Sequence, residues 1–196
     1  PLTKYTTQIT DADLIPRIVR EAFQKAEAEK PGPVHIELPK DISLDETDKE
    51  VLESATTQNK IAPQEDVLEG LEIIRNSKRP ILLVGAGANR KKLSKTLTSF
   101  VEKTGMPFVD TQMGKGVIDE RNPHYLGTLA LSSRDYIHCA VDKADLIIAV
   151  GYDLEEKLPF FSKEAKVLHI NFSPSDKNPF YKLDFQIIGD IDQIFL

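Results

Sequence analysis

The chain has 196 residues, of which 40% are hydrophobic and 29% are charged, a balance typical of a globular protein whose core folds without disulfides or metals. Its net charge of -6 argues against a nucleic-acid partner, which would require a basic stripe. No apolar stretch approaches the ~20 residues that cross a membrane, so no membrane association is expected.

Cys139 is the single cysteine, which rules out a disulfide within the chain and favours a reducing, cytoplasmic location. It lies in a predicted helix near Ile137 and Val141. We therefore expect Cys139 to be a buried, inert thiol.

The first 42 residues predict one helix and one strand. Residues 1–10 are expected to lead into a helix from Asp13, and Pro16 is tolerated because it falls in the first turn. The apolar stripe of this helix recurs at helical spacing: Leu14, Ile15, Ile18, Val19, Ala22, Phe23 and Ala26. Residues 31–33 end the helix, and residues 34–38 alternate as a strand.

Residues 43–60 are polar, charged and without periodicity, which predicts a linker. We therefore expect residues 1–42 to be the end of a preceding domain. Because the chain begins at Pro1 rather than Met and ends inside a helical-looking segment, we expect it to be a piece of a longer protein.

The second unit is organised around the stretch from Pro80 to Asn89. A helix is predicted over residues 64–76, and the apolar run 80–84 then stops at Gly85 and Gly87. An unbroken apolar run is typical of a strand buried on both faces of a parallel sheet. The pattern of strand, glycine turn and following helix is half of a nucleotide-binding unit.

The glycine turn lacks the third glycine of a dinucleotide fingerprint, because Arg90 stands at that position. Two interpretations therefore remain open. Gly85 and Gly87 either allow a ligand to approach the backbone or serve only a tight turn from strand to helix.

Further strands are predicted in the second unit at 106–110, 146–151, 167–172 and 185–190, and residues 117–130 have no regular pattern. Helices are predicted from Lys91 to a stop at Gly105, from a capping box at Ser132–Asp135 to about Val141, and after Asp190 at the end of the chain. This alternation indicates an α/β fold with a parallel sheet.

Ligands of such sheets bind beyond the carboxyl ends of the strands. The residues at those ends are glycines, amides, hydroxyls and acids, with hardly any general base, so they predict a nucleotide-binding rim rather than a catalytic centre. They are Gly85–Asn89, Thr111–Met113, Gly151–Asp153, Asn171–Phe172 and Asp190–Ile191. The four histidines are scattered, and we expect no metal site.

Five phrases together resemble the thiamine diphosphate-dependent enzymes of the acetolactate synthase and pyruvate oxidase group. In chain order they are KPGPVHIELPKDI (30–42), RPILLVGAGA (79–88), PFVDTQMGKGVIDERNPHYLG (107–127), ADLIIAVGYD (144–153) and IGDID (188–192). The resemblance implies that residues 1–42 end a pyrimidine-binding domain. It also implies that residues 61–196 form a Rossmann-like central domain, a parallel six-stranded sheet with helices on both faces.

Within this group the phrase VGYD is most similar to catabolic acetolactate synthases, which lack flavin. Flavin-containing relatives carry an arginine where Asp153 stands. The resemblance and the strand-end positions together give the candidate cofactor-binding residues, while the presence of FAD stays open. They are Gly85, Gly87, Asn89, Thr111, Gln112, Met113, Gly151, Tyr152, Asp153, Asn171, Phe172, Asp190 and Ile191.

The resemblance also implies where the chemistry lies. The family's catalytic glutamate precedes Pro1, and its diphosphate and Mg²⁺ motif follows Leu196, so we expect no catalytic residue and no activity in this piece. The parent would condense two pyruvates to 2-acetolactate with loss of CO₂. It would use thiamine diphosphate and Mg²⁺ and act as a homodimer or homotetramer, with the flanking domains of the same chain as partners.

Two alternatives remain. One is an autonomous FAD- or NAD-binding module, for which Asp110 would be the ribose-binding acid, although it lies a little far from Gly85. The other is a purely architectural domain whose rim binds nothing.

Overall fold

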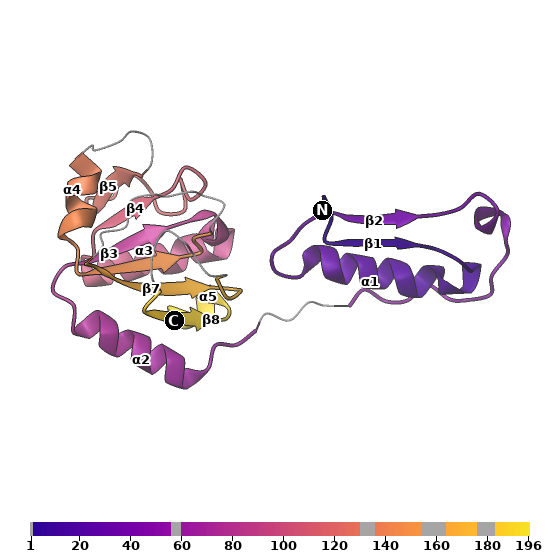
Figure 1. Cartoon of the computed structure of the whole chain (residues 1–196), viewed down its shortest axis with the longest axis horizontal. Coiled ribbons are helices and arrows are strands. Elements are labelled where there is room, and N and C mark those ends of the chain that lie inside the picture. Colours follow the sequence, from indigo (N-terminus) through magenta and orange to yellow (C-terminus); the bar gives the residue numbers. More distant parts are fainter. Residues whose placement is uncertain (1, 56–59, 130–135, 154–163, 176–182) are drawn as a thin grey trace. The chain divides into compact units, whose positions relative to one another are not determined.

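The computed structural model describes residues 2–55, 60–129, 136–153, 164–175 and 183–196. The chain divides into two compact units, Pro1–Asn59 and Lys60–Leu196, which are drawn in Figure 1.

The N-terminal unit is a pair of parallel strands and one helix. Strand β1 (Tyr5–Gln8) pairs with β2 (Val34–Glu37), with Tyr5 opposite Val34 and Gln8 opposite Glu37. Residues 1–10, which the sequence predicts only to lead into the helix, therefore include a strand, and that expectation is wrong. Along β1, Tyr5 and Thr7 are half-buried, whereas Thr6 and Gln8 are exposed. Because three of its four residues are Thr or Gln, the strand lacks the apolar alternation by which a strand is predicted from sequence.

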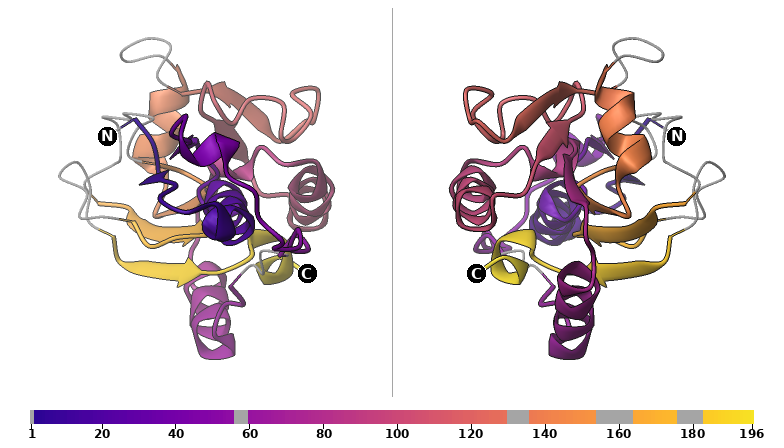
Figure 2. Two further views of the ribbon diagram at one scale, coloured as in Figure 1. Left: turned by 90° about the vertical axis from the view of Figure 1, so that its right-hand side faces the viewer. Right: turned by 90° about the vertical axis from the view of Figure 1, so that its left-hand side faces the viewer.

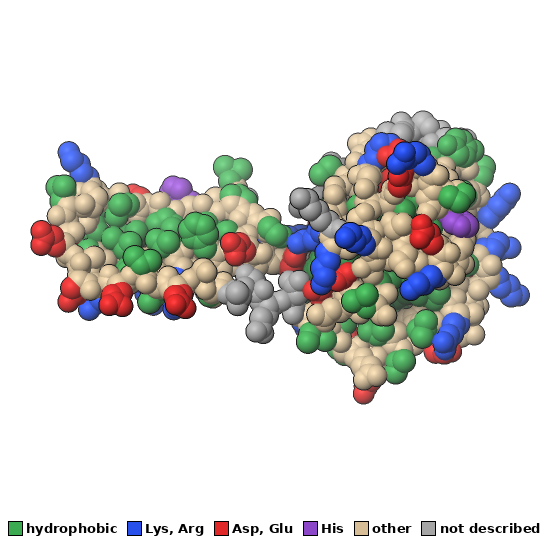
Figure 3. Space-filling model, turned by 180° about the vertical axis from the view of Figure 1, so that it is seen from behind, with side chains coloured by type: hydrophobic (Ala, Val, Ile, Leu, Met, Phe, Trp, Pro, Cys, Tyr) green, Lys and Arg blue, Asp and Glu red, His purple; other side chains and the backbone are tan. Residues whose placement is uncertain are grey.

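Helix α1 (Ile15–Glu27) follows a short 3-10 turn at Ala12–Leu14, so the predicted helix is confirmed and Pro16 lies in its first turn. Ile18 and Ala22 are its buried residues. Phe23, which belongs to the same apolar stripe, is 62% exposed to solvent. With Val51 and Leu52 it borders an apolar groove, and hydrophobic side chains gather on this unit in Figure 3.

The second unit is built on one parallel sheet in the order β5-β4-β3-β6-β7-β8. The strands are β3 (Pro80–Val84), β4 (Phe108–Asp110), β5 (Tyr125–Thr128), β6 (Leu146–Val150), β7 (Lys166–Asn171) and β8 (Phe185–Ile188). The helices are α2 (Gln64–Arg75), α3 (Lys91–Thr104), α4 (Tyr136–Lys143) and α5 (Ile191–Ile194). Counted along the chain, this is the 3-2-1-4-5-6 order of Rossmann folds.

The alternation of side chains along the strands gives the sheet two cores. Leu82 and Val84 of β3 face α3, whereas Ile81 and Leu83 face the opposite side, where α4 packs. Figure 2 shows α3 and α4 on opposite sides of the sheet. The expected α/β fold, with helices on both faces of six parallel strands, is therefore confirmed.

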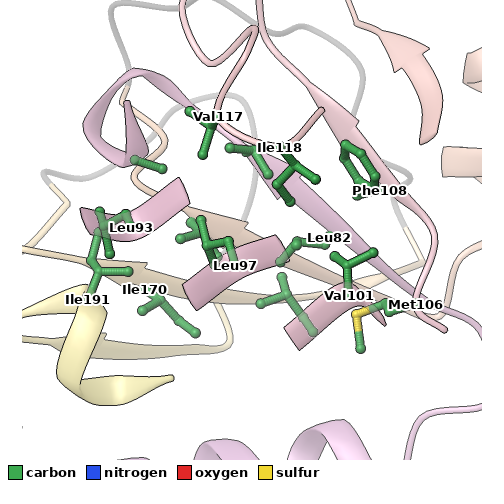
Figure 4. Close-up of a cluster of buried hydrophobic side chains, with 14 of the residues drawn as sticks. Leu82, Leu93, Leu97, Val101, Met106, Phe108, Val117, Ile118, Ile170 and Ile191 are labelled. Atoms are coloured by element: carbon green, nitrogen blue, oxygen red, sulfur yellow. The ribbon is translucent and has the colours of Figure 1, made fainter. Parts of the chain in front are cut away.

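Helix α3 supplies the centre of the larger core. Leu93, Leu97 and Val101 are at most 2% exposed and point toward Leu82 and Ile170 in Figure 4. The helix ends at Gly105, whose φ of 65° is left-handed, as the sequence predicts. Of the helices that the structure describes, none combines the length and apolar character needed to traverse a bilayer.

Two features of the second unit differ from what its sequence predicts. Residues 117–130 contain β5, which escaped detection because it is short and includes Gly127. Cys139 is exposed on α4, because the helix buries Ile137, His138 and Val141 and turns Cys139 toward solvent. The capping box predicted at Ser132–Asp135 lies outside the described residues.

The larger core predicts the effect of truncating α3. Leu97→Ala removes a fully buried side chain and should lower the free energy of unfolding by about 2–5 kcal/mol. Lys95→Ala, at an exposed position of the same helix, should change it by less than about 0.5 kcal/mol. Urea denaturation of both variants measures the difference, and equal losses would contradict the assignment of the core.

Candidate functional site

The strand ends gather the predicted rim residues at one edge of the sheet. The segments following β3, β4, β6, β7 and β8 all leave the sheet at its carboxyl edge, because every strand pair is parallel. Strand order reverses between β3 and β6, so Gly85 and Gly151 lie next to each other at the point where Rossmann folds bind ligands. This edge is the candidate functional site.

Hydrogen bonds within the chain occupy the backbone of the glycine turn. The amide of Gly85 donates to the carbonyl oxygen of Val150 at 2.9 Å, and that of Gly87 donates to Gly151 at 2.7 Å. The next three amides donate within the turn itself: Ala88 to Gly85, Asn89 to Ala86 and Arg90 to Ala88. These five amides are therefore already committed to protein acceptors.

The loops after β3 and β6 touch backbone to backbone. A Cβ on Gly87 would lie 2.9 Å from the carbonyl oxygen of Gly151, and a Cβ on Gly151 would lie 2.2 Å from the nitrogen of Ala88. Gly151 also has a φ of 60°, which favours glycine. Both glycines are thus required for close contact between two loops.

The loop after β4 covers the end of β3 in the same manner. The amide of Thr111 donates to the carbonyl oxygen of Val84 at 3.0 Å. A Cβ on Gly114 would lie 2.2 Å from that oxygen. Gly114 was not among the predicted site residues, because its role depends on a strand distant in the sequence.

Arg90, at the position of the absent third glycine, contacts two rim segments. Its guanidinium carbon lies 4.5 Å from the ring centroid of Phe172, a cation–π distance. Its Nε donates to the carbonyl oxygen of Gly87 at 3.3 Å. The sequence identifies position 90 as unusual because it lacks the third glycine, but it does not predict that Phe172 contacts Arg90.

The polar side chains of the rim also bind within the chain. Asn171 donates through Nδ2 to the carbonyl oxygen of Tyr152 at 3.0 Å, and its Oδ1 accepts from the amide of Phe172. The Thr111 hydroxyl accepts from the backbone amide of Gly114, and the side-chain Nδ2 of Asn89 donates to the carbonyl oxygen of Met113. The bonds of Asn171 to Tyr152 and of Asn89 to Met113 therefore connect neighbouring loops.

The remaining predicted residues divide between core and solvent. Tyr152 is 2% exposed in the α4-side core, and Ile191 is fully buried in the other core. Gln112 and Met113 are exposed, and Asp153 is half-buried. The structure brings the predicted residues to one edge, but it does not point all of their side chains into one space.

Asp190 helps to attach the linker to this edge. Its side chain accepts from the amide of Asp192 and caps α5, as predicted. Its own amide donates to the carbonyl oxygen of Lys60 at 2.7 Å, and a Cβ on Gly189 would lie 2.5 Å from the nitrogen of Ala62. The chain therefore enters the second unit across the carboxyl end of β8.

Two carboxylates near the rim have shifted pKa values of opposite sign. Burial raises the pKa of Asp110, which is 2% exposed, although hydrogen bonds from Thr128 and Tyr125 act in the other direction. Hydrogen bonds from Lys92 and Thr96 lower the pKa of Asp192, which forms a 2.6 Å ion pair with Lys92. Asp110 thus connects the end of β4 to Tyr125 of β5, and Asp192 connects α5 to Lys92 and Thr96 of α3.

Across the ranges that the structure describes, no group of three or more His, Cys, Asp and Glu side chains is placed to hold a metal ion. Asp110, considered as a ribose-binding acid, accepts a 3.1 Å hydrogen bond from Tyr125 and is buried beneath the rim.

Comparisons with known proteins connect this fold to one family. Residues 67–195 match the family model described as thiamine pyrophosphate enzyme, central domain. The chain is 30% identical over 98% of its length to the acetolactate synthase isozyme 2 large subunit of Escherichia coli. It is 35% identical over 89% of its length to acetolactate synthase 1, chloroplastic, of Zea mays.

A solved structure is similar over the whole chain. Benzoylformate decarboxylase from Polynucleobacter necessarius superposes with a TM-score of 0.82, covering 100% of this chain and 38% of that one, at 20% identity. The chain spans about a third of the curated relatives' own length, 36% of the bacterial and 29% of the maize protein.

The contact between the loops predicts a contrast between two glycines. Gly151→Ala places a Cβ against backbone and should lower the free energy of unfolding by about 3 kcal/mol or more. Gly116 has a φ of 83° but open space beside it, so Gly116→Ala should cost only the left-handed strain of about 1–2 kcal/mol. Urea denaturation compares them, and equal losses would show that backbone strain alone is responsible.

The raised pKa of Asp110 predicts a pH dependence. Because its folded pKa lies above the unfolded value of 3.8, its contribution to stability is fully present below pH 3.8 and is lost as the pH rises through the folded pKa. The free energy of unfolding of the wild type, minus that of Asp110→Asn, should therefore fall as the pH rises.

Tyr125→Phe provides the control for this pH dependence. It removes a hydrogen bond that lowers the pKa of Asp110, so the loss of stability should extend to higher pH. Urea denaturation across the acidic and neutral range measures both effects. A difference that stays constant with pH would contradict the burial of a titrating carboxyl.

Proposed function

The chain belongs to the thiamine pyrophosphate enzymes, whose central domain it carries, and on that premise we propose that it is part of an acetolactate synthase. The observation that supports this proposal is the extent of the similarity. It covers 98% of the chain, and so runs through both units and the segment between them. The proposed reaction joins two pyruvates to 2-acetolactate with loss of CO₂.

In this proposal the described chain contributes scaffold rather than catalysis. Thiamine diphosphate, held with Mg²⁺ in segments flanking this chain, supplies the carbanion chemistry. The second unit would hold the flanking domains in place, and the working enzyme would be a cytoplasmic homodimer or homotetramer.

An autonomous dinucleotide-binding module is the second candidate. The 3-2-1-4-5-6 strand order favours it, whereas the amides of the glycine turn, which already donate to protein acceptors, count against it. The two candidates differ in what the chain binds, so they can be tested separately.

The first test concerns the chain alone. Supplied with pyruvate, thiamine diphosphate and Mg²⁺, it should form no acetolactate, and calorimetry should detect no binding of thiamine diphosphate, because the reacting centre lies elsewhere. Turnover proportional to the concentration of the chain would contradict the proposal.

A chimera tests the positive part of the proposal. This chain would replace the aligned segment of the Escherichia coli large subunit, and the matched control would carry the aligned maize segment. We expect both to form acetolactate when circular dichroism shows that they are folded. An active control beside a folded but inactive chimera would count against an acetolactate synthase assignment.

A further inference from the structure

The glycine-rich turn follows a strand at the reversal point, where a Rossmann fold presents free amides to a diphosphate. In this chain the amides of Gly85 and Gly87 donate to Val150 and Gly151, at 2.9 Å and 2.7 Å. The next three amides donate within the turn. A diphosphate would therefore have to displace protein acceptors that are already in place.

The space between the two loops is also taken. The Cβ positions of Gly87 and Gly151 fall within 3.0 Å of backbone atoms in the opposite loop, so the two loops meet without a gap between them. The loop after β4 closes the other side, where Gly114 lies against the carbonyl oxygen of Val84. Three loops thus fill the reversal point with their own backbone.

The groups that would recognise the rest of a dinucleotide are committed as well. Asp110, the acid nearest the ribose position, is 2% exposed and bonded by Tyr125. Arg90 replaces the third glycine and stacks on Phe172. A ribose could therefore reach only the buried carboxylate of Asp110, and a second phosphate would meet an Arg90 guanidinium that already contacts Phe172.

From these contacts we infer that the glycine turn is a clasp between loops, formed by Gly87 against Gly151 and Gly114 against Val84, and that it holds neither FAD nor NAD. The clasp fixes the segments following β3, β4 and β6 relative to one another at the edge where the linker also enters. The inference concerns the central domain alone and stands whether or not the chain belongs to an acetolactate synthase.

Amide hydrogen exchange on the ligand-free chain tests the clasp directly. The amides of Gly87, Ala88 and Asn89 should be protected, because each donates within the protein. Adding FAD, NAD or ADP should leave their exchange unchanged. Rapid exchange in the free protein, followed by protection when a dinucleotide is added, would overturn the inference.

Calorimetric titration with the same three nucleotides accompanies the exchange measurement. We expect no saturable binding tighter than about 1 mM. Saturable binding that leaves the exchange of the turn unchanged would place the nucleotide elsewhere and would support the clasp. Binding at a ratio of one to one with slowed exchange in the turn would refute it.

The variant Arg90→Gly separates the clasp from a simpler explanation. It restores the three-glycine spacing while leaving the contact between Gly87 and Gly151 intact. If the clasp excludes the dinucleotide, this variant should still bind no FAD or NAD. Gain of binding in Arg90→Gly would show that the missing glycine, and not the clasp, excludes the dinucleotide.

Discussion

The second unit depends on the contact between two loops at the middle of its sheet. Gly87 donates to Gly151 across the reversal of strand order, and a Cβ on either residue would collide with backbone of the other loop. Gly151 in turn donates to Ile170 at the end of β7. This one contact therefore connects the ends of three neighbouring strands, β3, β6 and β7, and any side chain at these glycines would separate them.

The two cores explain why the contact can be so close. Strands β3 and β6 are buried on both faces, so packing against α3 on one side and α4 on the other fixes their height and register. With the strands fixed, Gly85 and Gly151, each the first residue after its strand, are held close to each other. The positive φ of Gly151 then turns the chain back toward the glycine turn.

The sequence predicts the parts of this fold that depend on local pattern. The unbroken apolar runs identify β3 and β6, and helical spacing identifies α3 and its end at Gly105. Strand β1 is polar, β5 contains Gly127, and the exposure of Cys139 depends on how α4 lies on the sheet. These three features are set by tertiary neighbours, which explains why local pattern misses them.

The candidate site is likewise predicted where it depends on local sequence and missed where it depends on residues distant in the chain. Sequence reasoning places the strand ends at one edge, because parallel strands share a direction, and it identifies the position of Arg90 as unusual. It cannot tell a glycine that admits a ligand from one that admits another loop, since both uses require the same absent side chain. What separates them is the partner facing the glycine. For Gly87 that partner is the carbonyl oxygen of Gly151, 64 positions further along the chain. A glycine motif at a strand end thus shows that something must approach the backbone closely there. Whether a ligand or another loop does so depends on the neighbouring part of the fold.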